Sequence, residues 1–427
     1  MKGTLARIRR GSLRRACRAF ALVSSPGPPV RHPLKLRITA TVDEAGPLPR
    51  GTLPDIIHHH APRGLPQAAL DLTPSASAAT DVDLCARLIE AYARATRLEN
   101  TEIDPTSRPN EGVWEMITHE YHGRLSQLLQ NGDAAALAAY LRNGLRSEAS
   151  HGLGPGAQVF TAAANAETAP TIAAIIVDRL IALAEALAIL PCENPEQGGW
   201  GQNLYEDLEK VIGVIEERCG HAIGTPRVFG NFGIATGDSL INVRTPDNLY
   251  TTHRMSVLLN GLAQKSVLEI GAGFGGTAYY AVLRGVRQFT IVDLPVMNVL
   301  QGFFLIKSLG WEAVTLFGER SDAARVRMLP YWEISRFERG QFDLAMNQDS
   351  LPEIPLARAR EYLENIPRFT KQFFYSINQE ALALAGQRDL RQLVVPWLVE
   401  AYPAYRRIAR HPYWLRRGYV EEVYELV

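Results

Sequence analysis

The sequence predicts an α/β protein in which a doubly wound parallel sheet follows a mostly α-helical domain. From residue 266 onward, strand-like and helix-like segments alternate, which is typical of a parallel sheet. A glycine-rich turn joins the first of these strands to the next helix, and residues 81–220 show helical periodicity. At 427 residues the chain is longer than one average domain. We expect three parts, in chain order 1–80, 81–225 and 226–427.

The composition bears on three questions: whether the chain binds nucleic acid, in which compartment it works and whether it crosses a membrane. The chain has 45 basic and 45 acidic residues, so its overall charge gives no case for binding nucleic acid. Its four cysteines are scattered without a CxxC pair, which favours a reducing, cytoplasmic location without a zinc site. The most apolar stretch, 171–190, is interrupted by Asp178, Arg179 and Glu185, and its apolar residues recur at helical spacing. We interpret it as a buried core helix, and we expect no transmembrane segment.

The first part of the chain, residues 1–80, is basic and rich in proline. Its first 29 residues contain no acid, and we interpret them as a disordered arm or as the product of a misplaced start codon. An amphipathic arm that touches an anionic surface and a targeting peptide are the alternatives. Residues 34–42 could form one strand. The run His58–His60 is more typical of a loop than of a metal site.

The second part, residues 81–225, reads as a series of helices. A helix begins at Asp81, with apolar residues at three and four spacing. Two further helices are joined at "NGD", where Gly132 suits a helix end and Asp133 suits the next N-cap. The helix of 171–190 follows, and another amphipathic helix ends at Gly220. We expect this helical region to pair two subunits or to cover the cleft of the next domain.

The third part, residues 226–427, contains the alternating segments. After a loop or short hairpin punctuated by glycines, a helix is expected over about 246–262. We predict parallel strands at 266–270, 289–293, 313–317, 342–346 and 372–377. We predict helices between them at about 276–285, 296–309, 321–330 and 355–369. The alternating segment 418–427 predicts an antiparallel strand at or near a sheet edge.

The turn between the first strand and the next helix, "EIGAGFGG", is suited to a nucleotide. Gly271, Gly273 and Gly276 fit the pattern GxGxxG, in which the backbone approaches the ligand closely beside the amides of a helix N-terminus. Asp293 ends the second strand, where a ribose-binding acid is expected in a Rossmann-like sheet. Two ligand classes share this pattern, NAD or FAD on one side and S-adenosylmethionine (SAM) on the other.

Three features favour SAM. Glu269 stands two residues before the first glycine and extends the motif to ExGxGxG with Gly275; its negative charge suits a cationic ligand better than pyrophosphate. The fourth strand ends in the polar run Asn347, Gln348 and Asp349, at the sheet edge where α/β sites assemble. The closing antiparallel strand also suits a methyltransferase sheet.

Several segments carry a resemblance to a known family. They are "GNFGIATGDSLINVRTPDNLYTTHRMSVLL", "SVLEIGAGFGGTAYYAVLRG", "FTIVDLPVMNVLQGFFLIKSLG", "FDLAMNQDSLPEIP" and "FFYSINQE", preceded by the helical stretch that begins "VWEMITHEYHG". The chain resembles the class I SAM-dependent methyltransferases over about residues 110–380. It resembles more closely the sugar O-methyltransferase family of bacterial polysaccharide loci.

This resemblance implies a role for each matching position. A SAM-binding turn is implied for Glu269, Gly271, Gly273 and Gly275. A ribose contact is implied for Asp293 and an adenine contact for Leu294. The methyl-transfer cleft is implied to be lined by Asn347, on the cofactor side, by Ser350, on the acceptor side, and by Asp349 and Glu353.

Methyl transfer to an alcohol needs a group that removes the hydroxyl proton near the transition state. The candidates by position are Asp349, Glu353 and His253. Each also has a structural interpretation: a helix cap for Asp349, a structural hydrogen bond for Glu353 and a buried histidine for His253. Tyr250 and Arg254, on the same helix as His253, could contact a hydroxylated ring. No set of His, Asp and Glu residues has metal-ligand spacing. The sequence therefore does not indicate a divalent metal, although it does not exclude one.

The sequence therefore predicts a SAM-dependent O-methyltransferase that acts on a sugar or a glycosylated small molecule. The acceptor is expected to be a small molecule or a glycan, which the sequence does not name. An NAD- or nucleotide-binding protein without methyl transfer is the first alternative. A non-catalytic partner subunit with the same fold is the second.

Overall fold

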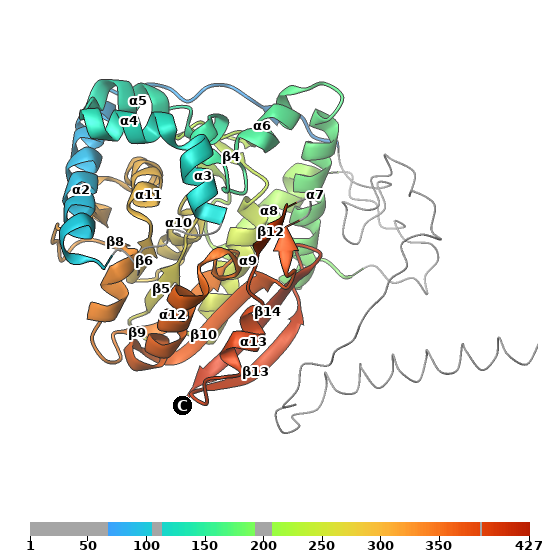
Figure 1. The fold of residues 1–427 in the computed structure, drawn as a ribbon. Helices are drawn as coiled ribbons and strands as arrows, with labels where there is room; N and C mark the ends of the chain where they lie inside the picture. The colour runs from blue at the N-terminus through green and yellow to red at the C-terminus, as the bar shows by residue number, and fades with distance from the viewer. Residues whose placement is uncertain (1–66, 105–112, 193–206, 385–386) are drawn as a thin grey trace, which may run out of the picture. The chain divides into compact units, whose positions relative to one another are not determined.

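The computed structural model describes residues 67–104, 113–192, 207–384 and 387–427. The basic arm, the strand expected at 34–42 and the run His58–His60 lie outside the described residues. Every candidate site residue lies inside them. Figure 1 shows the described chain as helices followed by a large sheet with its own helices.

The N-terminal half of the described chain is helical, as the sequence predicts. Its helices are α2 (Asp81–Glu102), α3 (Val113–Tyr121), α4 (Gly123–Asn131), α5 (Ala134–Leu141), α6 (Ala157–Ala164), α7 (Ala169–Ala186) and α8 (Leu208–Cys219). The predicted boundary between α4 and α5 is confirmed. Gly132 is left-handed at φ 68°, and the Asp133 carboxylate accepts a 2.9 Å hydrogen bond from the backbone N–H of Ala136. The left-handed Gly220 ends α8, also as predicted.

Helix α7 is the buried core helix that the sequence predicts. Its side chains Leu180, Ile181 and Leu183 are fully buried, and the helix packs against α6, α8 and the later helix α9 (Thr245–Leu258). Among the described residues, none of the helices has both the length and the apolar character needed to cross a membrane.

A small antiparallel sheet takes one strand from before the helices and three from after them. Its strands are, in spatial order, β1 (Leu70–Asp71), β3 (Gly233–Thr236), β4 (Ser239–Ile241) and β2 (Thr225–Pro226). Strands β3 and β4 form the short hairpin that the glycines predicted. The hairpin leads directly into α9, which carries residues of the candidate site.

The large sheet has eight strands. In spatial order they are β13 (Tyr405–Pro412), β14 (Tyr419–Leu426), β10 (Thr370–Gln379), β9 (Phe342–Gln348), β5 (Ser266–Ile270), β6 (Gln288–Asp293), β8 (Val326–Pro330) and β7 (Val314–Thr315). The strands from β10 to β7 pair in parallel, whereas β14 is antiparallel to β10 and to β13. The predicted Rossmann-like, doubly wound sheet is confirmed, together with the antiparallel strand that suits a class I methyltransferase sheet. A short hairpin, β11 (Ala383–Leu384) and β12 (Gln387–Arg391), lies between β10 and β13 in the sequence.

One predicted helix is wrong. Residues 321–330 were expected to be helical, but 326–330 form β8, which pairs in parallel with β6, and the strand predicted at 313–317 shrinks to the two-residue β7. The residues of "AARVRML" are good helix formers, so local propensity favoured a helix. Val326 and Met328 are fully buried in the sheet, and this burial outweighs the local preference. The closing strand β14 is antiparallel as predicted, but β13 covers its outer edge.

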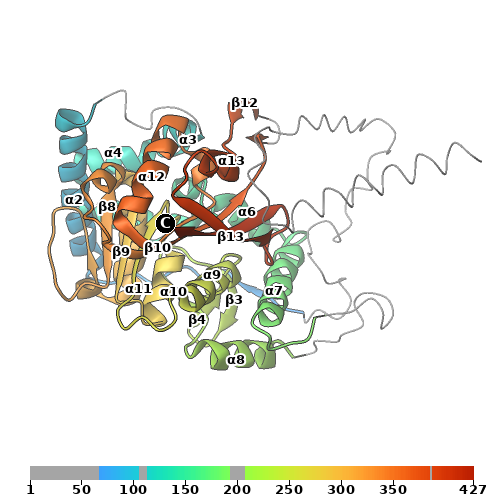
Figure 2. The same ribbon diagram turned by 90° about the horizontal axis from the view of Figure 1, so that it is seen from below.

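Helices cover both faces of the large sheet. One face carries α9, α10 (Gly276–Leu283) and α11 (Pro295–Leu309), and the other carries α12 (Leu356–Phe369) and α13 (Val395–Val399) (Figure 2). Alternation along β5 separates two hydrophobic cores, because Val267 belongs to the first and Leu268 to the second. The first core also contains side chains of α2, α4, α5 and α7, so the helical region packs onto the α11 side of the sheet. The domain boundary at 225/226 stays a prediction.

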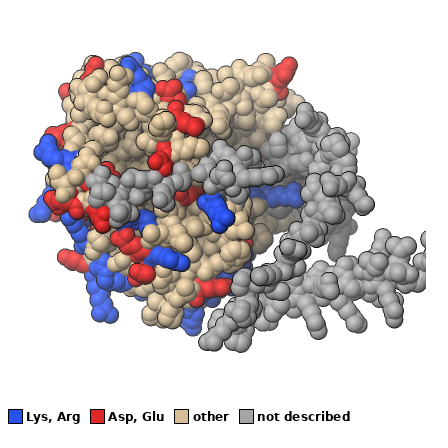
Figure 3. Space-filling model, in the orientation of Figure 1, with Lys and Arg blue, Asp and Glu red and all other residues tan. Residues whose placement is uncertain are grey.

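The connections place the point of reversal at β5. The chain runs from β5 to β6, then to the edge strand β7 and back to β8 beside β6, and it then crosses to β9 on the other side of β5. In open α/β sheets, ligands bind outside the carboxyl ends of the strands at this reversal. On the face drawn in Figure 3, acidic and basic side chains are interspersed over the described part of the surface. The prediction that nucleic acid is not a partner stays a prediction.

Candidate active site

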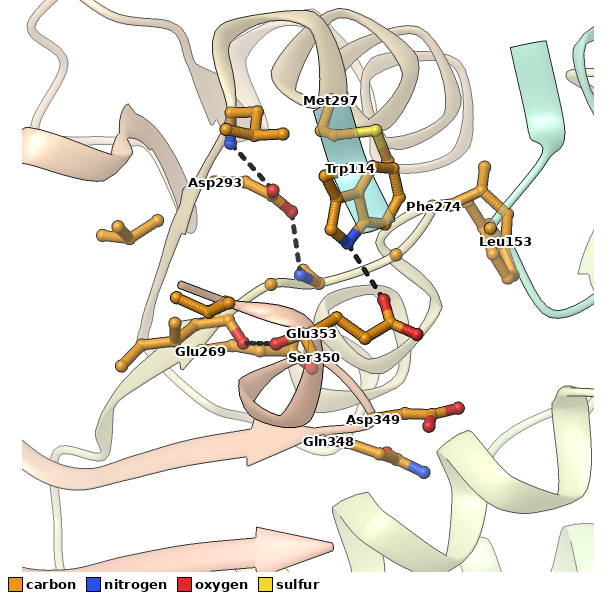
Figure 4. A pocket seen from close by; sticks show the side chains of 18 of the residues that line it. Trp114, Leu153, Glu269, Phe274, Asp293, Met297, Gln348, Asp349, Ser350 and Glu353 are labelled. Carbon is orange, nitrogen blue, oxygen red and sulfur yellow. Dashed lines mark hydrogen bonds between the residues drawn. The ribbon is translucent and has the colours of Figure 1, made fainter. Parts of the chain in front are cut away.

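A cavity of about 1060 Å³, counting the part that is open to solvent, lies at the point of reversal. Strands β5 and β6 contribute Glu269 and Asp293, and Asp349 directly follows β9. The helical region also reaches the cavity, through Trp114 of α3 and Leu153 (Figure 4). Residues of the sheet and of the helical region therefore line the same cavity.

The glycine turn forms one wall of this cavity. Gly271 is left-handed at φ 72°, and a Cβ at this position would lie 2.2 Å from Ser350 Oγ, so only glycine fits. Gly273 is left-handed at φ 56°, and no described atom lies within 4 Å of a Cβ built there. The turn ends at Gly275, which precedes α10. A ligand can therefore approach the backbone at Gly273 without meeting a side chain.

Glu269 places a buried carboxyl group beside the turn. The residue is 2% exposed, and its Oε2 accepts no hydrogen bond from any residue that the structure describes. Burial, followed by the charge of the nearby Asp293 carboxylate, raises the pKa of Glu269 from 4.5 to about 8. A buried carboxyl oxygen without a partner is costly unless a ligand supplies a hydrogen bond or a positive charge. The site is therefore suited to a cationic ligand with N–H donors.

Asp293 ties the turn to the end of β6. Its carboxylate accepts hydrogen bonds from the backbone N–H of Ala272 at 3.1 Å, from that of Leu294 at 2.8 Å and from the Gln301 amide at 2.7 Å. Burial raises the pKa of Asp293 to about 6, although these hydrogen bonds act in the opposite direction. The Gln301 amide also donates to the backbone oxygen of Gly273 at 3.0 Å. Asp293 and Gln301 thus hold the turn in its open shape.

An apolar wall adjoins Asp293. Phe274, Leu294 and Met297 line the cavity from the turn and from the start of α11. Phe274 and Met297 are almost fully buried. The edge-on contact between Phe274 and Phe304, with ring centroids 5.0 Å apart, fixes the orientation of the Phe274 ring. A flat, weakly polar ring such as adenine fits this wall, and Leu294 lies where the resemblance implies an adenine contact.

Asn347 and Ser350 connect β9 to β5 beneath the turn. The Asn347 amide and the Ser350 hydroxyl each donate a 2.8 Å hydrogen bond to the backbone oxygen of Ile270, and they also contact each other. Asn347 is fully buried, and it accepts a hydrogen bond from the backbone N–H of Leu351 at 3.1 Å. Ser350 lines the cavity, whereas Asn347 lies behind it. Both residues support the turn, and their implied ligand contacts stay predictions.

Asp349 has a strained backbone and a carboxylate with several partners. Its φ is +64°, a conformation that few residues other than glycine adopt. One carboxylate oxygen accepts a 2.6 Å hydrogen bond from the Tyr419 hydroxyl, and the other accepts a 2.7 Å hydrogen bond from Arg416. Arg244 lies 3.9 Å away. Because both oxygens of the Asp349 carboxylate already accept hydrogen bonds, the residue is better suited to position other groups.

Glu353 is better suited to accept a proton. It lines the cavity, and its Oε2 accepts a 3.0 Å hydrogen bond from the Trp114 indole N–H (Figure 4). Burial, followed by the charge of Asp349, raises the pKa of Glu353 from 4.5 to about 8. A carboxyl group that titrates near neutral pH can take up and release protons under working conditions.

Three residues of α9 that the sequence proposes as site residues do not line the cavity. Tyr250 donates a 2.7 Å hydrogen bond to Glu421 of β14, and Arg254 donates another of the same length to the other carboxylate oxygen. His253 is half-buried, and its pKa is lowered to about 4 by burial and by nearby arginines. None of the three side chains lines the cavity. The catalytic role of His253 and the substrate contacts of Tyr250 and Arg254 therefore stay predictions that the geometry does not support.

Helix α9 and the residue before it do reach the cavity, through two side chains that the sequence analysis missed. Arg244 and Asn248 line it. They are four residues apart and share one face of the helix, whereas Tyr250 follows Asn248 by two residues, about 200° around the helix. Arg244 and Asn248 were missed because the sequence analysis did not establish which face of α9 is turned toward the cavity. Gln301 was also missed, although an amide within the apolar run "VLQGFFLI" is a signal for a buried polar contact.

The described residues contain no group of three or more His, Cys, Asp or Glu side chains that could hold a metal ion.

Comparisons with known proteins find similarity only among solved structures. No protein-family model matches the chain, and no curated protein matches it. The mitomycin 7-O-methyltransferase MmcR is 14% identical, with 43% of this chain and 57% of that chain covered and a TM-score of 0.31. The 1,6-didemethyltoxoflavin N1-methyltransferase of Burkholderia thailandensis is 20% identical, with coverages of 40% and 76% and a TM-score of 0.28.

A third similar structure is a geranyl diphosphate methyltransferase, solved with sinefungin. It is 13% identical, with 44% of this chain and 80% of that chain covered and a TM-score of 0.33. All three are methyltransferases, but likenesses this weak carry no argument about the chemistry of this chain. The fold stands on the strand order itself, and the resemblance to sugar O-methyltransferases stays a prediction.

Proposed function

We propose that the chain is a SAM-dependent methyltransferase that transfers a methyl group to a hydroxyl of a sugar or a glycosylated small molecule. The observation that carries this proposal is the Glu269 carboxyl group, buried beside the open glycine turn with an oxygen that no described residue satisfies. A ligand with an ammonium group would supply the missing partner. Pyrophosphate would place negative charge beside it, which disfavours NAD and FAD.

The residues of the cavity fit the parts of SAM in order. The ammonium group would lie at Glu269, the ribose hydroxyls at Asp293 and the adenine at Leu294 and Met297. The unpartnered amide nitrogen of Asn248, 5% exposed and near the start of α10, adds polar capacity at the Glu269 end of the described site. The cofactor would supply an electrophilic methyl group.

The acceptor would lie between Trp114, Glu353 and Asp349. In the transfer, the acceptor oxygen forms a bond to the methyl carbon, the sulfur–methyl bond breaks, and the hydroxyl proton passes to the Glu353 carboxylate. Glu353 later releases this proton to solvent. With the pKa of Glu353 near 8, its reactive ionised fraction increases as the pH rises toward 8. The indole N–H of Trp114 holds the carboxylate in place.

The methylated group and the chemical class of the acceptor are supported by different observations. The hydroxyl as the methylated group is supported by Glu353, because an alcohol must lose a proton and Glu353 can accept it. The sugar is supported by the resemblance of the segments around Gly230, Asp293 and Asp349 to the sugar O-methyltransferase family.

Isothermal titration with SAM, S-adenosylhomocysteine and NAD tests the cofactor first. We expect binding of the two S-adenosyl compounds, weaker binding in Glu269→Gln, and no binding of NAD. Binding of NAD alone would replace the proposal with a nucleotide-binding protein. Incubation with methyl-labelled SAM and a panel of sugars, nucleotide sugars and glycosylated metabolites tests the transfer. SAM binding without label in any product would favour a non-catalytic partner subunit.

A further inference from the structure

Arg244 is a charged side chain of the cavity whose binding capacity is unused. It stands just before α9, lines the cavity and is only 16% exposed. In the described part of the chain, its guanidinium makes no hydrogen bond, and its sole ion pair is the 3.9 Å approach to Asp349. A guanidinium has five N–H donors, and a largely buried one is normally paired.

Asp349 does not satisfy Arg244, because its oxygens already have closer partners. Arg416 donates to one oxygen at 2.7 Å, and the Tyr419 hydroxyl donates to the other at 2.6 Å. Arg416 also stacks on the Tyr419 ring, 3.8 Å from its centroid. Asp349, Arg416 and Tyr419 therefore satisfy one another without Arg244. Two arginines face the Asp349 carboxylate, and Arg244 is the more distant of the two, so its N–H donors stay available to a ligand in the cavity.

The position of Arg244 favours an acceptor group over the donor. Asp293, the glycine turn and Asp349 belong to the ends of three adjacent strands, β6, β5 and β9, about 4.8 Å apart. In Figure 4, Asp293 and Asp349 lie at opposite ends of the site. A donor that extends from Asp293 across the turn to Glu269 occupies the first two strand ends, which leaves the β9 end, with Arg244, to the acceptor.

We infer that the methyl acceptor carries an anionic group, a carboxylate or a phosphate, that binds Arg244 at the β9 end of the cavity. This inference rests on the proposed function and narrows its substrate class to acidic sugars or sugar phosphates. Both anions match the planar fork of a guanidinium with two parallel hydrogen bonds. The anion would complete the pairing that Asp349 leaves open, and it would anchor the sugar with a hydroxyl turned toward Glu353.

Matched ligand pairs test the inference. Protein saturated with S-adenosylhomocysteine is titrated, by ligand-observed NMR, with D-glucuronate against D-glucose and with glucose 6-phosphate against glucose. We expect an acidic member to bind about tenfold more tightly than its neutral partner, and Arg244→Met to remove this difference. Arg244→Lys, which keeps the charge and loses the fork, should retain part of it. Arg339→Met, at an exposed arginine outside the cavity, is the control.

Three results would overturn the inference: equal binding of acidic and neutral members by the wild type, an acid preference that survives in Arg244→Met, or no binding of any acidic member. A loss of S-adenosylhomocysteine affinity in Arg244→Met would also overturn it, because Arg244 would then bind the carboxylate of the donor. A wild type that binds neither SAM nor S-adenosylhomocysteine would refute the proposed function instead. The same ligand pairs, titrated into the ligand-free protein, would then decide whether the anion site exists.

Discussion

The two ends of the cavity are built in different ways. The donor end comes mainly from one continuous segment, Glu269 to Met297, in which a strand, a turn and a helix lead to the next strand and to the start of α11. The acceptor end is assembled from α3, the loop at 152–154, α9, the end of β9 and the β13–β14 connection. The carboxyl groups also differ, since Glu269 has an oxygen without a partner in the described chain and both oxygens of Asp349 are occupied. An unsatisfied group indicates where a ligand binds, and a satisfied group indicates how the site is held.

The largest effect is expected from Glu353→Gln, which breaks the acceptor end alone. The amide keeps the shape of the side chain and can still contact Trp114, but it cannot accept the hydroxyl proton. General-base catalysis contributes roughly 10²- to 10⁴-fold, so we expect kcat to fall by about that factor. Methyl-labelled SAM and any acceptor found in the panel measure the rate, and isothermal titration measures the donor affinity.

The donor affinity is the internal control for this variant. It should stay within about twofold of the wild type, since Glu353 lies beyond the donor-binding segment. A variant that keeps its rate would remove Glu353 from the mechanism, and attention would return to Asp349. A variant that loses SAM binding would show that the two ends are not separate.

The next effect in size is expected from Asp293→Ala, which breaks the donor end. The substitution removes the acceptor of the ribose hydroxyls and the group that holds Ala272 and Gln301 around the turn. A hydrogen bond to a charged group contributes roughly 1.5–3 kcal/mol, so SAM should bind about 10- to 100-fold more weakly. Asp322→Ala, at an exposed acid between β7 and β8, should leave the affinity unchanged. Equal affinities of Asp293→Ala and the wild type would refute the ribose assignment.

The donor end could be predicted from the sequence because its parts are neighbours in the chain. A strand that ends at Ile270, a turn that requires left-handed glycines and an acid at the end of the next strand all follow from local rules. Strand β8, which pairs with β6, was not predictable in the same way. Residues 326–330 favour a helix locally, and only pairing with β6 makes them a strand.

The acceptor end could not be predicted, since its residues meet only after folding. The contact between Trp114 and Glu353 spans 239 positions of sequence, and no local pattern encodes it. On α9 the sequence favoured Tyr250 and Arg254 for their chemistry, but both side chains bind Glu421 instead. Arg244 and Asn248 reach the cavity because of the helix register, which composition alone does not give.

A smaller effect is expected from Trp114→Phe, which tests whether the helical region contributes to the chemistry of the acceptor end. The indole N–H stabilises the ionised form of Glu353, and its loss should raise the pKa of this carboxyl group further above its ordinary value. We expect the rise of kcat with pH to shift to higher pH, with nearly normal rates once Glu353 is ionised. The pH–rate profile measures this shift. A uniformly lower rate with an unshifted profile would limit Trp114 to a packing role.

The smallest effect is expected on stability, and it compares the donor site with and without its ligand. The pKa of Glu269 is raised from 4.5 to about 8 by folding, so the contribution of this group is fully present below pH 4.5 and is lost as the pH rises through 8. In the absence of SAM, Glu269→Gln should therefore gain thermal stability relative to the wild type as the pH rises from 5 to 9. In saturating SAM the order should reverse, because the wild-type carboxylate then has its cationic partner and the ligand stabilises the folded state. Thermal melts at the two pH values, with and without SAM, measure both differences. A Glu269→Gln variant whose relative stability does not change with pH would show that Glu269 is not held neutral by burial.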